Sequence, residues 1–200
     1  MEKHKLRIAV FGAGGHGKVV VDAIERNAGL AVACVVDDRP QPGMAVLGHP
    51  VAGGREALLE RKNSIDGVIV AIGDNRTRMA VAGWLEAQGF VLQSVAHPAA
   101  AVAPSASIGA GVLVMPGAVV NAEARIGANA IINSGAVVEH DCVVGDGVHV
   151  APGAVLCGGA SVGAGTLVGA GAVVLPGVKV GPALLVKAGT VAARNVEKED

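Results

Sequence analysis

The sequence predicts two domains of different class, a Rossmann-like α/β domain with a small parallel sheet and an all-β parallel β-helix. Two periodicities carry this prediction. Up to about residue 96, short apolar runs alternate with segments of helical apolar spacing, which is typical of βαβ units. From Val102 to Val186 an aliphatic residue recurs at every sixth position, fifteen times without interruption. We expect the domains to cover residues 1–96 and 97–200, because His97-Pro98 disfavours a continuous element.

The first domain is expected to hold alternating strands and helices. The strands follow apolar runs at Leu6–Phe11, Ala31–Val36, Val68–Ile72 and Phe90–Ala96. The helices are expected at about Gly15–Ala28, Gly54–Lys62 and Asn75–Gln88. A sheet of about four strands is half of a full dinucleotide fold, so its size suits one nucleotide.

The second domain is expected to be a triangular prism, because three hexads make a coil of eighteen residues and fifteen hexads make about five coils. The aliphatic residue of each hexad points inward, so the residue before it points outward. Sorted by eighteen, the outward residues form three rows: Val119, Val137, Val155, Val173, Val191; Leu113, Ile131, His149, Leu167, Leu185; and Ser107, Arg125, Val143, Ser161, Lys179. Because two rows are apolar, we expect a homo-oligomer that buries two sides.

Two histidines stand out among the residues between the aliphatic positions of the repeat. His140 occupies a corner between Glu139 and Asp141, where neighbouring hexads carry Gly, Ala, Asn or Pro. His149 interrupts an apolar row on the side opposite that corner, and a tolerated interface histidine is the alternative reading. Across one prism the two would lie on the order of 10–15 Å apart. We therefore expect them to meet only across a subunit contact.

His140 and Asp141 have the chemistry of a general base and its orienting acid. A neutral imidazole beside a carboxylate can take a proton from an attacking amine or hydroxyl, and Asp141 would stabilise the imidazolium. Cys142 falls at an inward small-residue position, so we expect it to fill the core rather than act as a nucleophile. Direct transfer is therefore expected, with the oxyanion held by a backbone N–H or by His149.

The loop after the first strand carries a phosphate-binding motif. Gly12–Gly17 reads GAGGHG, which fits G-x-G-x-x-G between a strand and a helix. Taken alone, the motif would suit a dinucleotide, with Asp37 on the ribose. The small sheet and His16 within the loop favour a single nucleotide instead.

Composition limits the remaining classes. The formal net charge of −1 argues against a nucleic-acid or anionic-membrane partner. The charged start of the chain and the lack of an apolar stretch of about twenty residues predict no signal peptide and no membrane span. The three cysteines are scattered without a CxxC pair, so we expect a cytoplasmic protein with reduced thiols and no metal.

The chain resembles the bacterial nucleotide-aminosugar N-acetyltransferases of surface-glycan synthesis and the related sialic acid O-acetyltransferases, which are hexapeptide-repeat enzymes with a left-handed β-helix. The resemblance covers nearly the whole chain. It rests on GAGGHGKVV at Gly12–Val20, VVDD at Val35–Asp38, AIGDNR at Ala71–Arg76 and INSGAVVEHDCVVGDGVHVAPGA at Ile132–Ala154. It implies a homotrimer that uses acetyl-CoA to acetylate the amine of a nucleotide-linked amino sugar, of the UDP-4-amino-sugar or GDP-perosamine type.

The resemblance also implies residue roles. The base is His140, and Asp141 raises its basicity. Acetyl-CoA would be held by His149, Gly169 and Ala170. The nucleotide-sugar would be held by Gly14, Gly15, His16, Asp37, Asp38, Gly73 and Asn133. One departure is the C-terminal segment, because many relatives carry a G-V-P-A-K-like stretch over the CoA adenine where this chain reads TVAARNVEKED.

Three alternatives stay open on the sequence alone. A sialic acid O-acetyltransferase would use the same base on another acceptor. A zinc hydratase, an activity of some β-helices of this type, would need three histidines with a short H-x4-H spacing, whereas only His140 and His149 lie in the repeat. A non-catalytic nucleotide-binding or scaffold protein would have no use for the His-Asp pair.

Overall fold

A computed structural model of the chain describes residues 5–198, so the charged residues 2–4, which bear on the signal-peptide expectation, lie outside the described residues. The chain divides into two compact units, Met1–Pro98 and Ala99–Asp200. Within the described range, no helix has both the length and the hydropathy needed to cross a bilayer.

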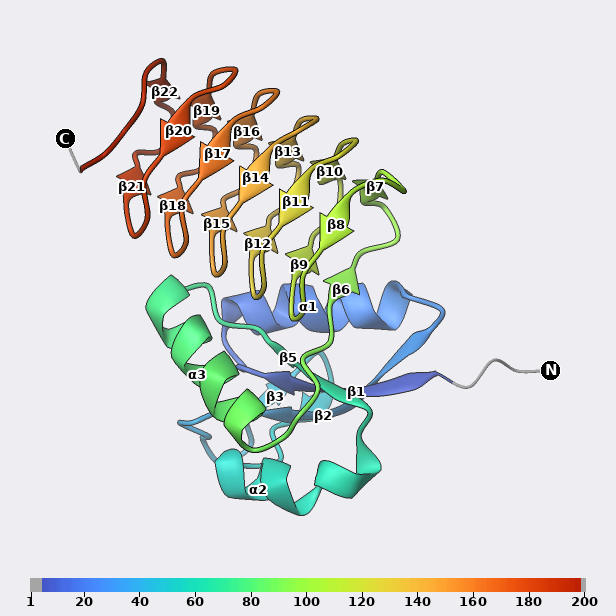
Figure 1. Cartoon of the computed structure of the whole chain (residues 1–200). Coiled ribbons are helices and arrows are strands. Elements are labelled where there is room, and N and C mark those ends of the chain that lie inside the picture. The colour runs from blue at the N-terminus through green and yellow to red at the C-terminus, as the bar shows by residue number, and fades with distance from the viewer. Residues whose placement is uncertain (1–4, 199–200) are drawn as a thin grey trace. The chain divides into compact units, whose positions relative to one another are not determined.

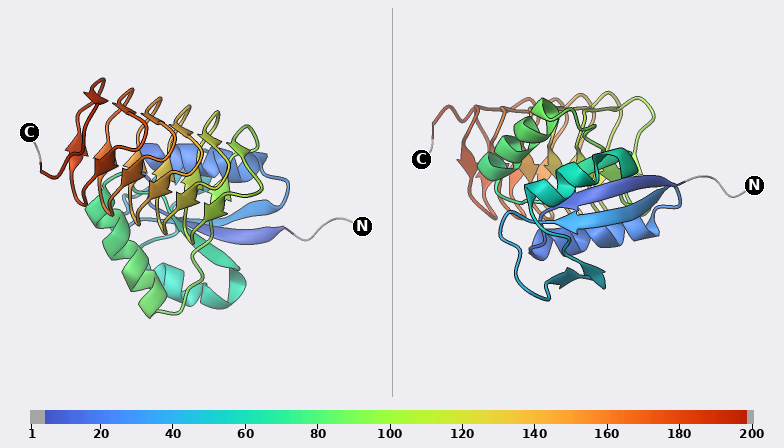
Figure 2. Two further views of the ribbon diagram at one scale, coloured as in Figure 1. Left: turned by 45° about the horizontal axis from the view of Figure 1, so that its top comes forward. Right: turned by 90° about the horizontal axis from the view of Figure 1, so that it is seen from below.

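The first unit is a three-stranded parallel sheet of order β2-β1-β5, with α1 on one face and α2 and α3 on the other (Figures 1 and 2). The strands are β1 (Leu6–Phe11), β2 (Leu30–Val36) and β5 (Gly67–Val70). The helices are α1 (Gly15–Arg26), α2 (Arg55–Glu60), the 3₁₀ turn η1 (Lys62–Ser64) and α3 (Asn75–Ala87). Alternation along β1 explains the layers, because Ala9 and Phe11 pack against Leu58, Val81 and Leu85 of α2 and α3.

The predicted strand at Phe90–Ala96 is wrong in extent. Leu92 makes a single parallel bridge to Val68, and only Val95–Ala96 forms a short strand, β6. Phe90 and Leu92 are nevertheless buried in the same core as α3. The apolar run therefore reflects burial of an irregular segment, which apolar spacing cannot distinguish from a strand.

A short hairpin follows β2 that the sequence did not predict. It consists of β3 (Ala45–Val46) and β4 (His49–Pro50), which pair in antiparallel fashion. Leu47 and Gly48 form its two-residue turn with φ values of 47° and 86°. Two positive φ values match the twist of a tight hairpin, but Leu is a poor residue for that conformation, so the sequence carries little signal for the turn.

The second unit is a parallel β-solenoid in which two-residue strands stack along three sheets (Figure 1). The strands are β7 (Ala101–Val102), β8 (Ser107–Ile108), β9 (Leu113–Val114), β10 (Val119–Val120), β11 (Arg125–Ile126), β12 (Ile131–Ile132), β13 (Val137–Val138), β14 (Val143–Val144), β15 (His149–Val150), β16 (Val155–Leu156), β17 (Ser161–Val162), β18 (Leu167–Val168), β19 (Val173–Val174), β20 (Lys179–Val180), β21 (Leu185–Val186) and β22 (Val191–Ala192). Within the second unit, the strands of the three sheets run in the orders β22-β19-β16-β13-β10-β7, β20-β17-β14-β11-β8 and β21-β18-β15-β12-β9. Val119 pairs with Ala101 and Val137, so the coil has eighteen residues as predicted.

Aliphatic and small residues fill the prism, and glycines turn its corners. Val120, Val138 and Cys142 are fully buried along this core. The third residue after each inward aliphatic residue has a positive φ from Gly111 to Gly189, a conformation that favours glycine. Within that range the exceptions to glycine are Glu123, Asn129, Asp141 and Ala183.

Candidate active site

His140 and His149 belong to different sides of the solenoid. His140 lies at the corner between β13 and β14, where two of the sheets meet. His149 is the first residue of β15, in the third sheet. The register therefore puts the two histidines on opposite parts of the prism, as the eighteen-residue period predicts.

The side chains of His140 and Asp141 form an exposed pair. His140 Nδ1 lies 2.7 Å from Asp141 Oδ2. This hydrogen bond is the largest cause of a raised His140 pKa, and the charges of Asp141 and Glu139 add to it. Because the carboxylate engages Nδ1, the Nε2 edge is the one that can exchange a proton with a ligand.

Asp141 occupies a backbone position that favours glycine. Its φ of 60° lies in the left-handed region, like that of the glycines at the same position of most other coils. Asp tolerates this conformation better than most side chains do, but glycine would be easier. Glu123 occupies the same left-handed position one coil earlier, so what distinguishes Asp141 is its hydrogen bond to His140.

Sequence reasoning missed a residue that supports this corner. Asn121 Nδ2 donates a hydrogen bond to Glu139 Oε2 at 2.9 Å. Asn121 lies eighteen residues before Glu139, so it is the residue in the same position of the preceding coil. The signal was available, because sorting corner residues by eighteen brings polar partners together just as it does the outward rows.

Asn133 contacts His149 directly. Its Nδ2 lies 2.9 Å from His149 Nε2, while its Oδ1 accepts a hydrogen bond from the Ser134 N–H. The amide orientation that satisfies both bonds makes Nε2 an acceptor, which places the proton of a neutral His149 on Nδ1. The structure thus joins Asn133 to a residue that is expected at the cofactor.

Gly169 and Ala170 lie where two coils of the solenoid touch. A Cβ on Gly169 would be 2.6 Å from Ala188 N, and the Gly169 N–H already donates to Val186 O. Ala170 is exposed, and its carbonyl accepts from the Gly189 N–H. Glycine at 169 is therefore needed for coil packing, whatever else binds there.

The remaining expected residues line one pocket in the first unit, with a volume of about 460 Å³. This volume suits a small-molecule ligand. The lining includes six expected residues: Gly14, Gly15, His16, Asp37, Asp38 and Gly73. Helix α1 begins at Gly15 without a side-chain cap and without an acidic residue in its first turn. Its N-terminus therefore has the partial positive charge and the open N–H groups that favour an anion.

The glycines of the loop have different physical reasons. A Cβ on Gly12 would lie 2.7 Å from Ala71 O, and one on Gly17 would lie 2.3 Å from Gly12 O. These two contacts are with backbone, so Gly12 and Gly17 are needed for the fold. Cβ atoms on Gly14, Gly15 and Gly73 would meet nothing within 4 Å. The fold therefore leaves room for a side chain at these three positions, all of which line the pocket.

The two aspartates after β2 have separate partners. Asp37 Oδ2 accepts a hydrogen bond from the Ala13 N–H at 2.8 Å and so fixes the glycine loop. Asp38 is held by Arg55 through two bonds of 2.9 Å, which lower the Asp38 pKa. The guanidinium of Arg55 in turn lies 4.6 Å from the ring centroid of Trp84. Sequence reasoning missed Arg55.

A buried arginine is bonded to two of the residues that line this pocket. Arg78 is 1% exposed and donates to the carbonyls of Ile72 and Gly73, both at 3.0 Å. Burial, and secondarily the charge of Arg78, lower the pKa of His16 to about 4. His16 is therefore neutral at physiological pH and offers the pocket a hydrogen-bonding ring without a charge.

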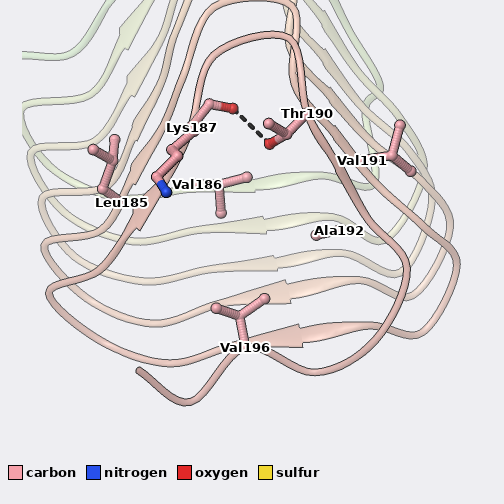
Figure 3. Close-up of a pocket in the computed structure, with 7 residues that line it drawn as sticks. All are labelled: Leu185, Val186, Lys187, Thr190, Val191, Ala192 and Val196. Carbon is pink, nitrogen blue, oxygen red and sulfur yellow. Dashed lines mark hydrogen bonds between the residues drawn. The ribbon is translucent and has the colours of Figure 1, made fainter. Parts of the chain in front are cut away.

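Another hollow lies at the C-terminal end of the solenoid and contains none of the expected site residues (Figure 3). Its walls include the inward residues Val186, Ala192 and Val196, and the hydroxyl of Thr190 is bonded to the Lys187 carbonyl. It is the open end of the inner column. Among residues 5–198, no cluster of three or more His, Cys, Asp or Glu side chains could hold a metal ion.

Family models match both units. The model of the PglD N-terminal domain covers residues 7–85. The model of the bacterial transferase hexapeptide, six repeats long, covers residues 105–140 and 123–158. A curated relative, the UDP-N-acetylbacillosamine N-acetyltransferase of Bacillus subtilis (strain 168), is 37% identical over 117 residues, which are 54% of this chain and 50% of that protein. The match therefore spans about half the length of that curated relative.

Solved structures match the whole chain. Perosamine N-acetyltransferase from Caulobacter crescentus, in a structure with CoA and GDP-perosamine, is 41% identical, with 96% of this chain and 90% of that chain covered and a TM-score of 0.91. The acetyltransferase domain of PglB from Neisseria gonorrhoeae, in a structure with acetyl coenzyme A, is 34% identical, with 98% and 94% covered and a TM-score of 0.86. The chain therefore belongs to the nucleotide-aminosugar N-acetyltransferase family of hexapeptide-repeat enzymes, and it is an acetyltransferase.

Proposed function

We propose that the chain transfers the acetyl group of acetyl-CoA to the amine of a nucleotide-linked amino sugar of the UDP-4-amino-sugar or GDP-perosamine type, in bacterial surface-glycan synthesis. The observation that carries the proposal is the His140–Asp141 pair, set at a corner of a solenoid that matches perosamine N-acetyltransferase over nearly its whole length. N-acetylation is favoured over sialic acid O-acetylation, because perosamine N-acetyltransferase and UDP-N-acetylbacillosamine N-acetyltransferase, two of the similar proteins, are named as N-acetyltransferases.

The reaction needs one base and one stabilised oxyanion. The substrate amine attacks the thioester carbonyl carbon while His140 Nε2 takes a proton from the nitrogen. The tetrahedral intermediate then collapses, the C–S bond breaks, and the imidazolium returns the proton to the leaving CoA thiolate. Asp141 holds the ring through Nδ1 and stabilises the imidazolium. His149 and the main chain at Gly169 and Ala170 are proposed to hold the thioester end of acetyl-CoA.

The pocket of the first unit is proposed to hold the nucleotide. The diphosphate would lie at the N-terminus of α1, beside Gly14 and Gly15. Asp37 and Asp38 line the same pocket and can accept hydrogen bonds from ribose or base. His16, kept neutral by burial, and Gly73 would complete the contacts, and Asn133 is proposed to act from the solenoid.

We further propose a homotrimer with active sites shared between subunits. The outward row Val119, Val137, Val155, Val173 and Val191 runs along one sheet, and each of these side chains keeps some exposure in the single chain. The second apolar row offers less, because Leu113 and Ile131 are already buried within the chain. A solution mass of about three times the 19.7-kDa chain is expected by sedimentation equilibrium, and a monomer would contradict it. A cytoplasmic location is proposed as well, since Cys34, Cys142 and Cys157 are free thiols.

The decisive experiment combines binding, turnover and one base variant. Calorimetry and acetyl transfer with UDP-, GDP- and dTDP-linked amino sugars should show one of them preferred over free sugars. His140→Ala should lower kcat by about 10²–10⁴-fold, which is the range for a general base. His49→Ala is the matched control, because His49 bonds Glu25 in the first unit and does not line the nucleotide pocket.

The proposal fails if His140→Ala keeps a rate within about tenfold of the parent. It also fails if none of the nucleotide-linked amino sugars is acetylated. Acetylation of free sialic acid hydroxyls in that case would support the O-acetyltransferase alternative.

A further inference from the structure

One corner position of the solenoid departs from its pattern in a single coil. The second residue after each inward aliphatic residue carries a side chain in fourteen of the fifteen hexads, and in the remaining one it is Gly158. The set is Pro104, Ala110, Pro116, Ala122, Ala128, Ser134, His140, Asp146, Pro152, Gly158, Ala164, Ala170, Pro176, Pro182 and Ala188. Gly158 lies eighteen residues after His140, which is the same position of the next coil.

The missing side chain is the one that would collide with the catalytic ring. A Cβ on Gly158 would lie 2.7 Å from both Cε1 and Nε2 of His140, and 3.4 Å from Cδ2. The two coils are tied together at this point, since the Gly159 N–H donates to the His140 carbonyl at 2.9 Å. The backbone therefore cannot readily separate to make room. The ring would have to move.

The backbone at 158 gives no other reason for glycine. The left-handed turn position of this hexad is Gly159, with a φ of 70°, whereas the φ of Gly158 lies outside the left-handed region. Alanine stands at the same corner position two coils earlier, as Ala122, and one hexad later, as Ala164. Alanine at 158 is thus compatible with the coil, and its one conflict is with the mobile end of the His140 side chain.

We propose that Gly158 is a positioning residue for His140, whose absent side chain leaves the space in which the imidazole lies across the next coil. The ring in this space keeps Nδ1 on Asp141 and directs its Nε2 edge over Gly158. The proposal rests on the proposed function, in which His140 is the base. It separates the needs of the fold from those of the reaction, because the coil accepts alanine and the ring does not.

The test is Gly158→Ala, measured by kinetics and by imidazole titration. We expect kcat to fall at least tenfold, with KM for both substrates changing less than about threefold. NMR titration should show the His140 pKa moving down toward its ordinary value, because the displaced ring loses its hydrogen bond to Asp141. Gly83→Ala is the matched control. A Cβ on Gly83 meets nothing within 4 Å, so this variant should change neither kcat nor the His140 titration.

Thermal unfolding gives a readout that does not depend on activity. In the His140→Ala background the ring is gone, so Gly158→Ala should raise the Tm, as glycine-to-alanine changes do at compatible positions. In the parent the same change should raise Tm less or lower it, because the ring must be displaced. Equal Tm shifts in the two backgrounds would overturn the proposal.

The two proposals can fail separately. If His140→Ala is inactive while Gly158→Ala keeps full kcat and an unchanged His140 titration, the positioning role is wrong and the base assignment stands. If His140→Ala is active, the base assignment is wrong. The titration and the Tm comparison then still decide whether Gly158 makes room for the ring.

Discussion

The two units of the chain carry their functional residues in opposite ways. In the first unit the functional residues conform to a pattern, since Gly12, Gly14 and Gly17 fit G-x-G-x-x-G between β1 and α1. In the solenoid they depart from one, since His140 stands at a corner where the same position of the other coils carries Pro, Ala or Gly. A motif indicates function where residues match its pattern, whereas a repeat indicates function where a residue differs from those at the same position of the other coils.

The difference matters because residues that match a motif can be required for different physical reasons, which the motif does not distinguish. The motif glycines look alike in sequence, yet Gly17 faces backbone at contact distance and Gly14 faces open space. The solenoid has a built-in comparison at every position, so a departure such as Asp141 or Gly158 can be weighed against the other coils. Inside the motif only three-dimensional structure separates the glycines.

The largest effect is expected from variants that compare two glycines of the motif, Gly17 and Gly14. Gly17→Ala should destabilise the first unit by about 3 kcal/mol or more, because its Cβ would meet a carbonyl of the same loop that cannot move away. Gly14→Ala should leave the Tm within about 2 °C and raise the KM for the nucleotide-sugar about tenfold, by filling the pocket. Thermal unfolding and steady-state kinetics on both variants check this.

Equal losses of stability in Gly17→Ala and Gly14→Ala would contradict the view that only Gly17 is required for the fold. A normal KM for Gly14→Ala would remove the glycine loop from the nucleotide site. Lys18→Ala is a suitable control in the same helix, because Lys18 is exposed and does not line the pocket.

Much of the solenoid could be predicted from sequence, and the reason is the period itself. One register fixed the strands, the eighteen-residue coil and the inward residues, and the structure confirms all three. Side-chain contacts between residues of different coils were harder to predict from the sequence. Asn121 and Glu139 lie at the expected spacing of eighteen, whereas Asn133 and His149 are sixteen apart, because Asn133 lies two residues beyond Ile131, the strand partner of His149.

The first unit was predicted less completely, because it has no internal sequence repeat that fixes the positions of its helices and strands. The helices were found within a few residues, while the hairpin at Leu47–Gly48 was missed and the strand near Phe90 was overextended. The charged partners of the pocket were also missed. Arg55 and Arg78 lie on helices that sequence could locate, but nothing in their spacing shows which side chain would turn toward Asp38 or Gly73.

The second effect in size tests whether a departure from the repeat is functional. Asp141→Gly removes the carboxylate and replaces it with the residue that the left-handed backbone favours, so stability should be unchanged or increased. Activity should nevertheless fall about 10- to 100-fold, because Nδ1 of His140 loses its partner. Asp141→Asn is the matched variant, which keeps the size and removes the charge.

The pH dependence of kcat/KM also tests the role of Asp141, because the direction in which it shifts can be predicted. The hydrogen bond that His140 makes to the Asp141 carboxylate raises the His140 pKa above its ordinary value of 6.5, and only the neutral ring is a base. The acid limb of kcat/KM in the parent should therefore lie above pH 6.5, with activity lost as pH falls through it. In Asp141→Asn and Asp141→Gly the limb should move to lower pH. An unmoved limb would show that another group titrates.

The smallest effect concerns His16, which occupies one of the variable positions of the motif. Its folded pKa of about 4 lies below the ordinary value of 6.5, so between these pH values the unfolded chain binds more protons. The free energy of unfolding should therefore fall as the pH drops, by about 1–2 kcal/mol between pH 7 and pH 5. The lowered carboxyl pKa values of Asp38 and Asp74 act only at lower pH, which leaves this window to histidine.

The measurement is the Tm or the denaturant midpoint at pH 7 and pH 5 in the parent and in His16→Asn. His140 works in the opposite direction because its pKa is raised, and it is present in both proteins, so it cancels in the comparison. The variant should lose less stability than the parent over this range. An identical loss would mean that His16 is hydrated and titrates near its ordinary pKa. The pocket would then contain a hydrated histidine that gains a charge near its ordinary pKa, and not the neutral ring that burial produces.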